Sequence, residues 1–481
     1  EIQSAKNQRK AKPAPSPEPP ASIAYNNTNN NGRDGYCDGG CCSSYTTPFV
    51  LSMNIHFIFL IHGFMGNSNE LSYIEEAIQE ATTKTKRNEK DTDNTGDGDV
   101  EIITHRVTCN NKKTFDGIEA GGERAAQEIT TFVSDHYHKH KCNAKDNNTS
   151  DGEEDEFHAW ISFIGYSLGG MYARYAISAL PLLEESQKSN NNGIVLHPNI
   201  FVTAATPHLG MASHSYWAVP RCMEYLLGYG FGRTGQDLFR LNRHNKENPN
   251  NNATTSTEQP TDIVYKMATE DRFLNPLLAF RRRISYINAF AADFQVPTKT
   301  AGMLSLYSNS PHHLMSSKYN HWNSETIGFD VFAFETKRRS RPDRGIQSSG
   351  TRSRKNDEAL TMSISLDSLG WTKVFVDDSR KGMPGPSVRC ICRRPRKDLM
   401  DDAIAEKKKK ENDDNSIVFE SRELCKLLKT SEHWHLAPSG HFVLVAHSKT
   451  KRGAKKSAKG RPLVNQAALD LVRDVRRERF T

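Results

Sequence analysis

A serine flanked by two glycines is the feature of this sequence that most directly suggests chemistry. The stretch FIGYSLGGMYARYA (163–176) contains the pattern G-x-S-x-G at residues 165–169, with Ser167 at its centre. This pattern is typical of a nucleophilic serine on a sharp turn between a strand and a helix. Such a short pattern also arises by composition, so the flanking segments have to decide its meaning. The apolar strand WISFI (160–164) before it and the helical pattern of residues 168–183 after it favour a nucleophile over a turn that merely packs.

Two backbone N–H groups are expected to face the oxygen that becomes negatively charged during acyl transfer. The N–H of Leu168 lies at the start of the helix, where backbone donors have no partner within the helix. The stretch HGFMG (62–66) follows an apolar strand, and its glycines let the backbone approach a ligand closely. The N–H of Phe64 or Met65 is the second expected donor, and an ordinary glycine-rich turn is the alternative interpretation. His62 is expected to be structural, because a base that precedes the nucleophile is not the chain order of this fold.

The acid that assists a serine nucleophile should follow it in the chain and end a strand. In α/β-hydrolases the order is Ser, then Asp or Glu, then His. Asp293 follows the apolar stretch ISYINAFAA (284–292), and a carboxylate at the carboxyl end of a strand faces the same crevice as the serine. A surface-loop aspartate is the alternative interpretation. Asp330, in GFDVF, is a second candidate, although its surroundings are typical of a lid or an insertion.

The histidine is expected in the loop between the last strand and the last helix. The segment HWHLAPSGHFVLVAHSK (433–449) holds His433, His435, His441 and His447. His441 follows Pro-Ser-Gly, a turn signal, and is the favoured general base. His447 follows the apolar stretch FVLVA and is kept as the alternative base. The hypothesis is attack by Ser167, with His441 acting as base and then acid while Asp293 orients its imidazole.

The segments around these residues alternate between apolar strands and amphipathic helices. The expected strands are residues 55–63, 100–107, 157–167 and 199–207, followed by strands within 281–293 and 369–378. The expected helices are residues 68–82, 117–137, 168–183 and 462–479. Such alternation predicts a mostly parallel sheet with helices on both faces. We therefore expect an α/β fold, and more specifically the α/β-hydrolase fold.

Polar low-complexity tracts interrupt this alternation. Residues 1–46 are rich in Pro, Asn, Ser and Gly and are expected to be disordered. Residues 47–481 are expected to form one α/β-hydrolase domain. Further tracts fall between the expected elements, where insertions are tolerated, and those at about 337–358 and 379–415 are basic.

Composition narrows the classes of cofactor and partner. The 481 residues carry 64 Lys and Arg against 57 Asp and Glu, a net charge of +7. The excess lies in basic runs, which are expected to be solvated loops, with an anionic lipid surface as the next interpretation. The nine cysteines lack zinc spacing, so that no metal and no cofactor are expected. Reduced thiols are typical of a cytoplasmic protein, and no apolar run is long enough to cross a membrane.

Six blocks of the sequence occur in an order that is familiar from one family. They are FLIHGFMGN, DGIEAGGERAAQEI, FIGYSLGGMYARYAI, FVTAATPHLG, FRRRISYINAFAADFQVPTKTA and GHFVLVAHSK. Together they resemble the serine esterase family of eukaryotic α/β-hydrolases, lipase-like proteins that include lipid-droplet phospholipases. The resemblance implies that Asp293 is the acid and supports His441 as the base. Tyr166 stands where many members carry histidine, and the basic insertions between acid and base are not a shared feature.

The resemblance implies a serine esterase or lipase that cleaves carboxylic ester bonds of acylglycerols or phospholipids through an acyl-enzyme. The expected partners are a lipid ester substrate and, peripherally, a membrane or lipid-droplet surface, whereas no nucleic acid is expected. Two alternatives stand beside it. One is a thioesterase or deacylase of lipid-modified proteins, and the other is a non-catalytic α/β scaffold that binds anionic lipid.

Overall fold

The computed structural model describes the sheet of the protein and the helices packed on it. The described residues are 55–90, 100–145, 157–180, 183, 194–212, 221–242, 262–288, 293, 295–304, 313–315, 322, 324–338, 354–377, 441, 443–446 and 457–477. The expected boundary between residues 1–46 and 47–481 lies outside them, as do the whole of the insertion 379–415 and most of the insertion 337–358. These assignments therefore stay predictions.

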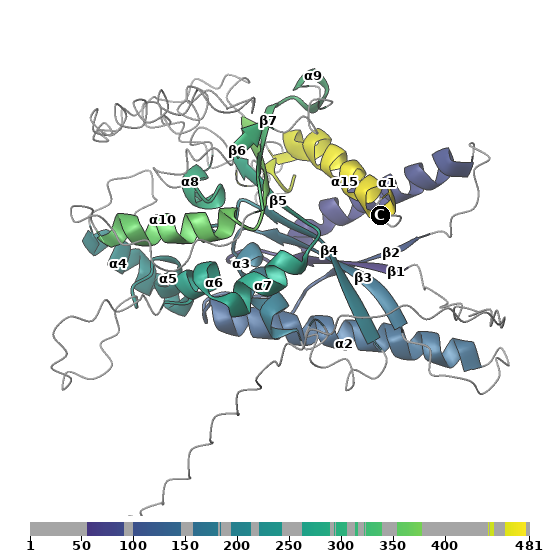
Figure 1. Ribbon diagram of the computed structural model, residues 1–481, viewed down its shortest axis with the longest axis horizontal. Coiled ribbons are helices and arrows are strands. Elements are labelled where there is room, and N and C mark those ends of the chain that lie inside the picture. The colour runs from purple at the N-terminus through teal and green to yellow at the C-terminus, as the bar shows by residue number, and fades with distance from the viewer. Residues whose placement is uncertain are drawn as a thin grey trace, which may run out of the picture. The chain divides into compact units, whose positions relative to one another are not determined.

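Eight strands of the described chain form one sheet, in the order β2-β1-β3-β4-β5-β8-β7-β6 (Figure 1). Their bounds are β1 Ile55–Ile61, β2 Glu101–Arg106, β3 Phe157–Tyr166, β4 Ile194–Ala204, β5 Arg282–Asn288, β6 His313–Met315, β7 Asp330–Thr336 and β8 Thr372–Asp377. The first six strands in this order pair in parallel, whereas β7 pairs antiparallel with both β8 and β6. The α/β fold with a mostly parallel sheet is therefore confirmed.

The antiparallel edge of the sheet differs from what the sequence suggests. The surroundings of Asp330 are typical of an insertion, but Asp330–Thr336 instead joins the sheet as β7. The buried ring of Phe334 lies edge-on to Phe375 of β8, at 5.5 Å between ring centroids. The strand is therefore fixed by its pairing with β8, which its own local sequence does not show.

Helices cover both faces of the sheet. The described helices are α1 Ser72–Lys90, α2 Ile118–Lys145, α3 Leu168–Ala179, α4 Arg221–Gly230, α5 Gly232–Leu238, α6 Ile263–Thr269, α7 Asp271–Ala279, α8 Thr298–Ala301, α9 Ser324–Ile327, α10 Arg354–Asp367 and α15 Arg461–Arg477, with 3₁₀ turns η1 Ser68–Leu71 and η5 Ala458–Gly460. Helices α2 and α3 pack together on one face, and α1 and α15 pack together on the other (Figure 1).

The strand β1 shows why both faces have to be covered. All seven of its residues are buried, as expected of a strand inside a parallel sheet. Phe57 and Phe59 belong to the core under α2 and α3, whereas Ile58 and Leu60 belong to the core under α1 and α15. Successive side chains therefore serve opposite faces, which follows from the two-residue period of a strand.

Helices α1 and α2 extend further than their hydrophobic pattern predicts, and the expected helix 117–137 continues as α2 to Lys145. The first expected helix, residues 68–82, begins as the 3₁₀ turn η1 and continues as α1 to Lys90, into a stretch expected to be an inserted tract. An ion pair between Glu80 and Lys84 at 2.7 Å supports this polar extension, since residues four apart are neighbours on a helix. No described helix combines the length and the apolar character that crossing a bilayer would require.

Candidate active site

Ser167 occupies a strained turn between β3 and α3. Its backbone has φ 53° and ψ −125°, a conformation that costs a non-glycine residue about 1–3 kcal/mol. The Ser167 N–H donates a hydrogen bond of 2.8 Å to the carbonyl oxygen of Ala204, at the end of β4, which anchors the turn. The side chain is nearly buried at 8% exposure. A strained serine at the carboxyl end of a central strand has the geometry that G-x-S-x-G nucleophiles use.

Two glycines allow the chain to pass close to this turn. A Cβ atom on Gly63, in the loop after β1, would lie 2.7 Å from the Cβ of Ser167. A Cβ atom on Gly169 would lie 2.1 Å from the carbonyl oxygen of Ile61. Real side chains do not fit at such distances, so these positions require glycine. The loop after β1 is thereby placed directly against Ser167.

The backbone donors expected around Ser167 are not equivalent. The Leu168 N–H lies at the first position of α3, where a helix leaves its amides without internal partners. The Met65 N–H donates a hydrogen bond of 2.9 Å to Thr114 Oγ1, so this donor is already engaged. Phe64 is therefore favoured over Met65 as the second donor toward a substrate oxygen. Met65 has φ 52°, and this backbone conformation is part of the same turn.

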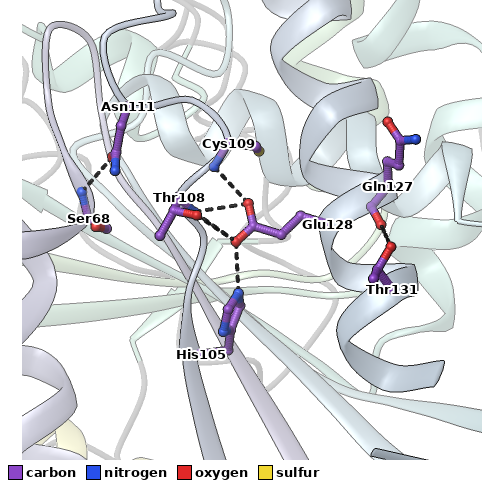
Figure 2. Close-up of polar contacts among 8 residues, drawn as sticks. All are labelled: Ser68, His105, Thr108, Cys109, Asn111, Gln127, Glu128 and Thr131. Carbon is purple, nitrogen blue, oxygen red and sulfur yellow. Dashed lines mark hydrogen bonds and ion pairs between the residues drawn. The ribbon is translucent and has the colours of Figure 1, made fainter. Parts of the chain in front are cut away.

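The loop after β1 is held by the loop after β2. Besides the Thr114 contact, the Ser68 N–H donates a hydrogen bond of 2.9 Å to Asn111 Oδ1 (Figure 2). The second loop is held in turn by Glu128 of α2. Its carboxylate accepts hydrogen bonds from the backbone N–H groups of Thr108 and Cys109 and contacts the His105 ring at 2.9 Å (Figure 2).

Glu128 is suited to this role because it stays ionised. Burial opposes ionisation, but the hydrogen bonds from His105, Thr108 and Cys109 outweigh it and lower the pKa of Glu128 to about 2. Burial, followed by the contact with Glu128, raises the pKa of the Cys109 thiol to about 12. The thiol is therefore unreactive at neutral pH. Figure 2 shows this carboxylate between the end of β2 and α2.

Asp293 and His441 meet although they lie far apart in the chain. Asp293 Oδ2 lies 2.7 Å from His441 Nδ1, and both side chains are buried. The carboxylate is fixed by three further donors, since Asn288 Nδ2 reaches Oδ2 at 3.0 Å and the N–H groups of Gln295 and Val296 reach Oδ1 at 2.8 and 3.0 Å. A carboxylate at Nδ1 favours the tautomer in which Nε2 accepts a proton.

Tyr166, the residue before Ser167, packs against the imidazole of His441 and so connects the Asp293–His441 pair with the serine turn. The rings of Tyr166 and His441 lie 4.9 Å apart at 44°. The Tyr166 hydroxyl is buried and has no hydrogen-bond partner among the described residues. Burial, followed by the charges of Asp293 and Glu70, raises the pKa of Tyr166 well above its usual range. Tyr166 therefore stays neutral, and its ring packs against the imidazole.

The chain after His441 is fixed by the C-terminal helix. Val443 and Val445 are buried in the same core as Leu463 and Val464 of α15. At Gly460, just before α15, a Cβ atom would lie 1.9 Å from the carbonyl oxygen of Val443. The backbone two residues after His441 is therefore in close contact with the chain that begins α15.

The other histidines considered from the sequence have different surroundings. His208 is fully buried, with Nε2 3.0 Å from Thr203 Oγ1 and Nδ1 3.3 Å from Arg174. Burial, followed by the positive charges of Arg174 and Lys373, holds the pKa of His208 well below its usual range. His62 is buried, with Nδ1 3.1 Å from the Gly63 carbonyl oxygen. Both environments suit structural roles.

Some candidate residues cannot be compared with the structure. His433, His435 and the alternative base His447 lie outside the described residues, and so does the side chain of Asp330. Among the residues that are described, no group of three or more His, Cys, Asp and Glu side chains could hold a metal ion.

Several contributors to the site were not found from the sequence. No local sequence pattern identifies Thr114, Asn111 or Glu128, because each side chain forms its hydrogen bonds with a different segment of the chain. Asn288 had a detectable signal, because it ends the strand that leads to Asp293 and carries a polar side chain at the carboxyl edge of the sheet.

Comparison with known proteins identifies the family to which the chain is similar. Residues 52–306, just over half of the chain, match the family described as "Putative serine esterase (DUF676)". The chain is 29% identical over 275 residues to "Putative lipase ROG1" of Saccharomyces cerevisiae, covering 56% of this chain and 32% of that protein. It is 25% identical over 260 residues to "Putative lipase C4A8.10" of Schizosaccharomyces pombe, covering 52% of this chain and 26% of that protein. The similarity thus spans about a third or less of these relatives' own length.

Proposed function

Because this chain belongs to the "Putative serine esterase (DUF676)" family, we propose that it hydrolyses carboxylic ester bonds of lipids through Ser167, Asp293 and His441. One observation carries the assignment of residues. The buried hydrogen bond between Asp293 and His441 lies beside a turn in which Ser167 has a strained backbone. Relatives that are named lipases support a lipid substrate.

The first half of the proposed reaction forms an acyl-enzyme. Ser167 Oγ attacks the ester carbonyl carbon while His441 Nε2 accepts its proton, and Asp293 stabilises the resulting imidazolium. The N–H groups of Leu168 and Phe64 stabilise the negative charge on the carbonyl oxygen. The bond from carbon to the alcohol oxygen then breaks, and His441 returns the proton to the leaving alcohol.

The second half uses water in place of the serine. His441 accepts a proton from a water molecule, whose oxygen attacks the acyl carbon. The bond to Ser167 Oγ breaks, and the proton passes from His441 to Oγ, which releases the carboxylic acid and restores the enzyme. We further propose a cytoplasmic protein that works peripherally on a membrane or lipid-droplet surface, because its substrates are held there.

Covalent labelling tests the assignment. A fluorophosphonate probe should label the full chain, whereas Ser167→Ala should abolish labelling and His441→Ala should slow it strongly. Hydrolysis of long-chain and short-chain p-nitrophenyl esters, compared with matched thioesters, then separates a lipase from a thioesterase. Labelling of Ser167→Ala at the wild-type rate would refute the nucleophile, and thioester turnover far above ester turnover would refute the ester substrate.

A further inference from the structure

The large exposed apolar side chains of the described residues come from three segments that ring contacts of Phe64 join: the loop of Met65, the loop of Phe115 and residues 225–231. Among the described residues, the large apolar side chains with high exposure are Met65, Phe115, Tyr225, Leu226, Leu227, Tyr229 and Phe231. We refer to these seven residues as the apolar surface. Leu226 is 64% exposed and Tyr229 is 60% exposed. Exposed apolar groups scattered singly need no explanation, whereas a gathered set indicates an interaction surface.

Aromatic contacts join this surface to the loop after β1, which carries Phe64, the proposed oxyanion donor. The ring of Phe64 lies 4.8 Å from the ring of Phe115 and 5.3 Å from the ring of Phe231. The Thr234 N–H of α5 also donates a hydrogen bond of 3.2 Å to the Phe115 carbonyl oxygen. The helices α4 and α5, which lie together in Figure 1, are thereby fixed beside the loop that contacts Ser167.

The apolar residues of α4 point away from the protein. Glu224 of this helix is buried, and Gly228 faces Leu241, where a Cβ atom would lie 2.6 Å from Leu241 Cδ1. Tyr225 and Tyr229 lie one turn apart with their rings stacked at 6.4 Å, and both are exposed. The helix thus buries an acidic residue and exposes its aromatic ones, the reverse of an ordinary surface helix.

The exposed charges next to the apolar surface are mostly basic, and the acidic Asp116 beside Phe115 is paired with Arg124. Lys112 and Lys113 are exposed two or three residues before Phe115. Arg233 follows Phe231 and is 60% exposed, with a 3.3 Å contact to Asp237. Tyrosine is favoured where an apolar layer meets water, and lysine and arginine are attracted to anionic headgroups. This combination of exposed apolar and basic side chains fits a lipid surface as its partner better than it fits the polar surface of another protein.

We propose that the apolar surface docks the protein on an anionic lipid surface, with the loop of Phe64 turned toward the lipid. The side chains of Leu226 and Tyr229 enter the headgroup region, while Lys112 and Lys113 face its negative charge. The purpose of docking rests on the proposed function, since it brings lipid esters to Ser167. Docking itself does not require a reactive serine, so that the two proposals can fail separately.

Vesicle flotation with the full chain tests the proposal. The probes are phosphatidylcholine vesicles with and without phosphatidylserine. The double variant Leu226→Asp/Tyr229→Asp should lower the bound fraction on phosphatidylserine vesicles about tenfold. The matched control Gln127→Asp/Thr131→Asp makes the same change in charge on exposed residues of α2 and should bind as the wild type does (Figure 2). Ser167→Ala should also bind as the wild type does.

Further variants keep the test decisive. If the aspartate pair unfolds the protein, as thermal unfolding would reveal, Leu226→Ser/Tyr229→Ser provides the same test without added charge. Lys112→Gln/Lys113→Gln should reduce the preference for phosphatidylserine. The proposal is overturned if the wild type does not float with anionic vesicles, or if the α2 control loses binding equally. It is also overturned if sedimentation shows that the apolar surface instead joins two copies of the chain.

Discussion

Asp293 Oδ2 and His441 Nδ1 lie 2.7 Å apart, although 148 residues separate them in the chain. Three other donors to the Asp293 carboxylate come from within five residues of it, so the acid is fixed locally and the histidine is brought to it. This arrangement defines one tautomer of the imidazole.

Asp293→Asn should lower kcat for a soluble ester about 10³–10⁴-fold with little change in KM, because the amide favours the wrong tautomer of His441. The measurement is steady-state hydrolysis of p-nitrophenyl butyrate. Asp116→Asn is the control, since Asp116 is half-exposed in its ion pair with Arg124 and should leave kcat within about twofold. Equal kcat for Asp293→Asn and the wild type would place the acid elsewhere.

Tyr166 should act through its ring and not through its hydroxyl. The buried hydroxyl has no hydrogen-bond partner in the described chain, so Tyr166→Phe should preserve kcat and raise the free energy of unfolding by about 1 kcal/mol. Tyr166→Ala removes the ring beside His441 and should lower kcat at least about tenfold. Urea unfolding and ester hydrolysis measure the two effects. A kcat for Tyr166→Phe as low as that for Tyr166→Ala would assign the hydroxyl a role of its own.

Thr114 should set the shape of the loop that carries Phe64 and Met65. Thr114→Val keeps the volume but removes the acceptor for the Met65 N–H, so that kcat should fall about tenfold while KM stays nearly constant. Thr114→Ser keeps the hydroxyl and should restore most of kcat. The rate of fluorophosphonate labelling should follow the same order. If serine and valine reduce kcat equally, the hydrogen bond is not what matters.

Glu128 should make stability depend on pH in one direction. Its pKa is about 2 in the folded protein against an ordinary 4.5, so its stabilising contribution is complete above pH 4.5 and is lost as the pH falls toward 2. Glu128→Gln should lower the free energy of unfolding at pH 7 by about 2 kcal/mol. The gap between the variant and the wild type should narrow below pH 4.5.

Urea unfolding from pH 3 to pH 8 measures this gap. Glu80→Gln is the control, because Glu80 forms an exposed ion pair with Lys84 and should change stability by no more than about 0.5 kcal/mol. A gap for Glu128→Gln that widens toward low pH would contradict the direction of the shift.

The parts of the fold that could be predicted are those that a short stretch of sequence determines by itself. The apolar strand before Ser167, the helix after it and the chain order of acid and base are all visible in short segments. The pairing of Asp293 with His441 was expected from that order, and the structure brings the two side chains together. The roles of these residues stay a proposal.

The parts that were not predictable depend on which elements become neighbours. The Thr114 contact with Met65 arises because β2 lies beside β1, and nothing near Thr114 records this. The strand β7 stands outside the alternation of strands and helices and joins the sheet by antiparallel pairing with β8, which its local pattern does not show. The sequence of α4 is aromatic and apolar, which fits a lid or pocket wall as well as an ordinary packing helix, because hydrophobicity alone does not say which face is covered.

The contact between Gly460 and Val443 has a consequence for the order of events during synthesis. The strained Ser167 turn and the loop of Gly63 come from early parts of the chain, and they can form while translation continues. The segment of His441 acquires its place only against the start of α15, which leaves the ribosome later. If Ser167 and His441 act as proposed, a nascent chain would carry a formed serine turn without its base, and ester cleavage would begin only after α15 has docked.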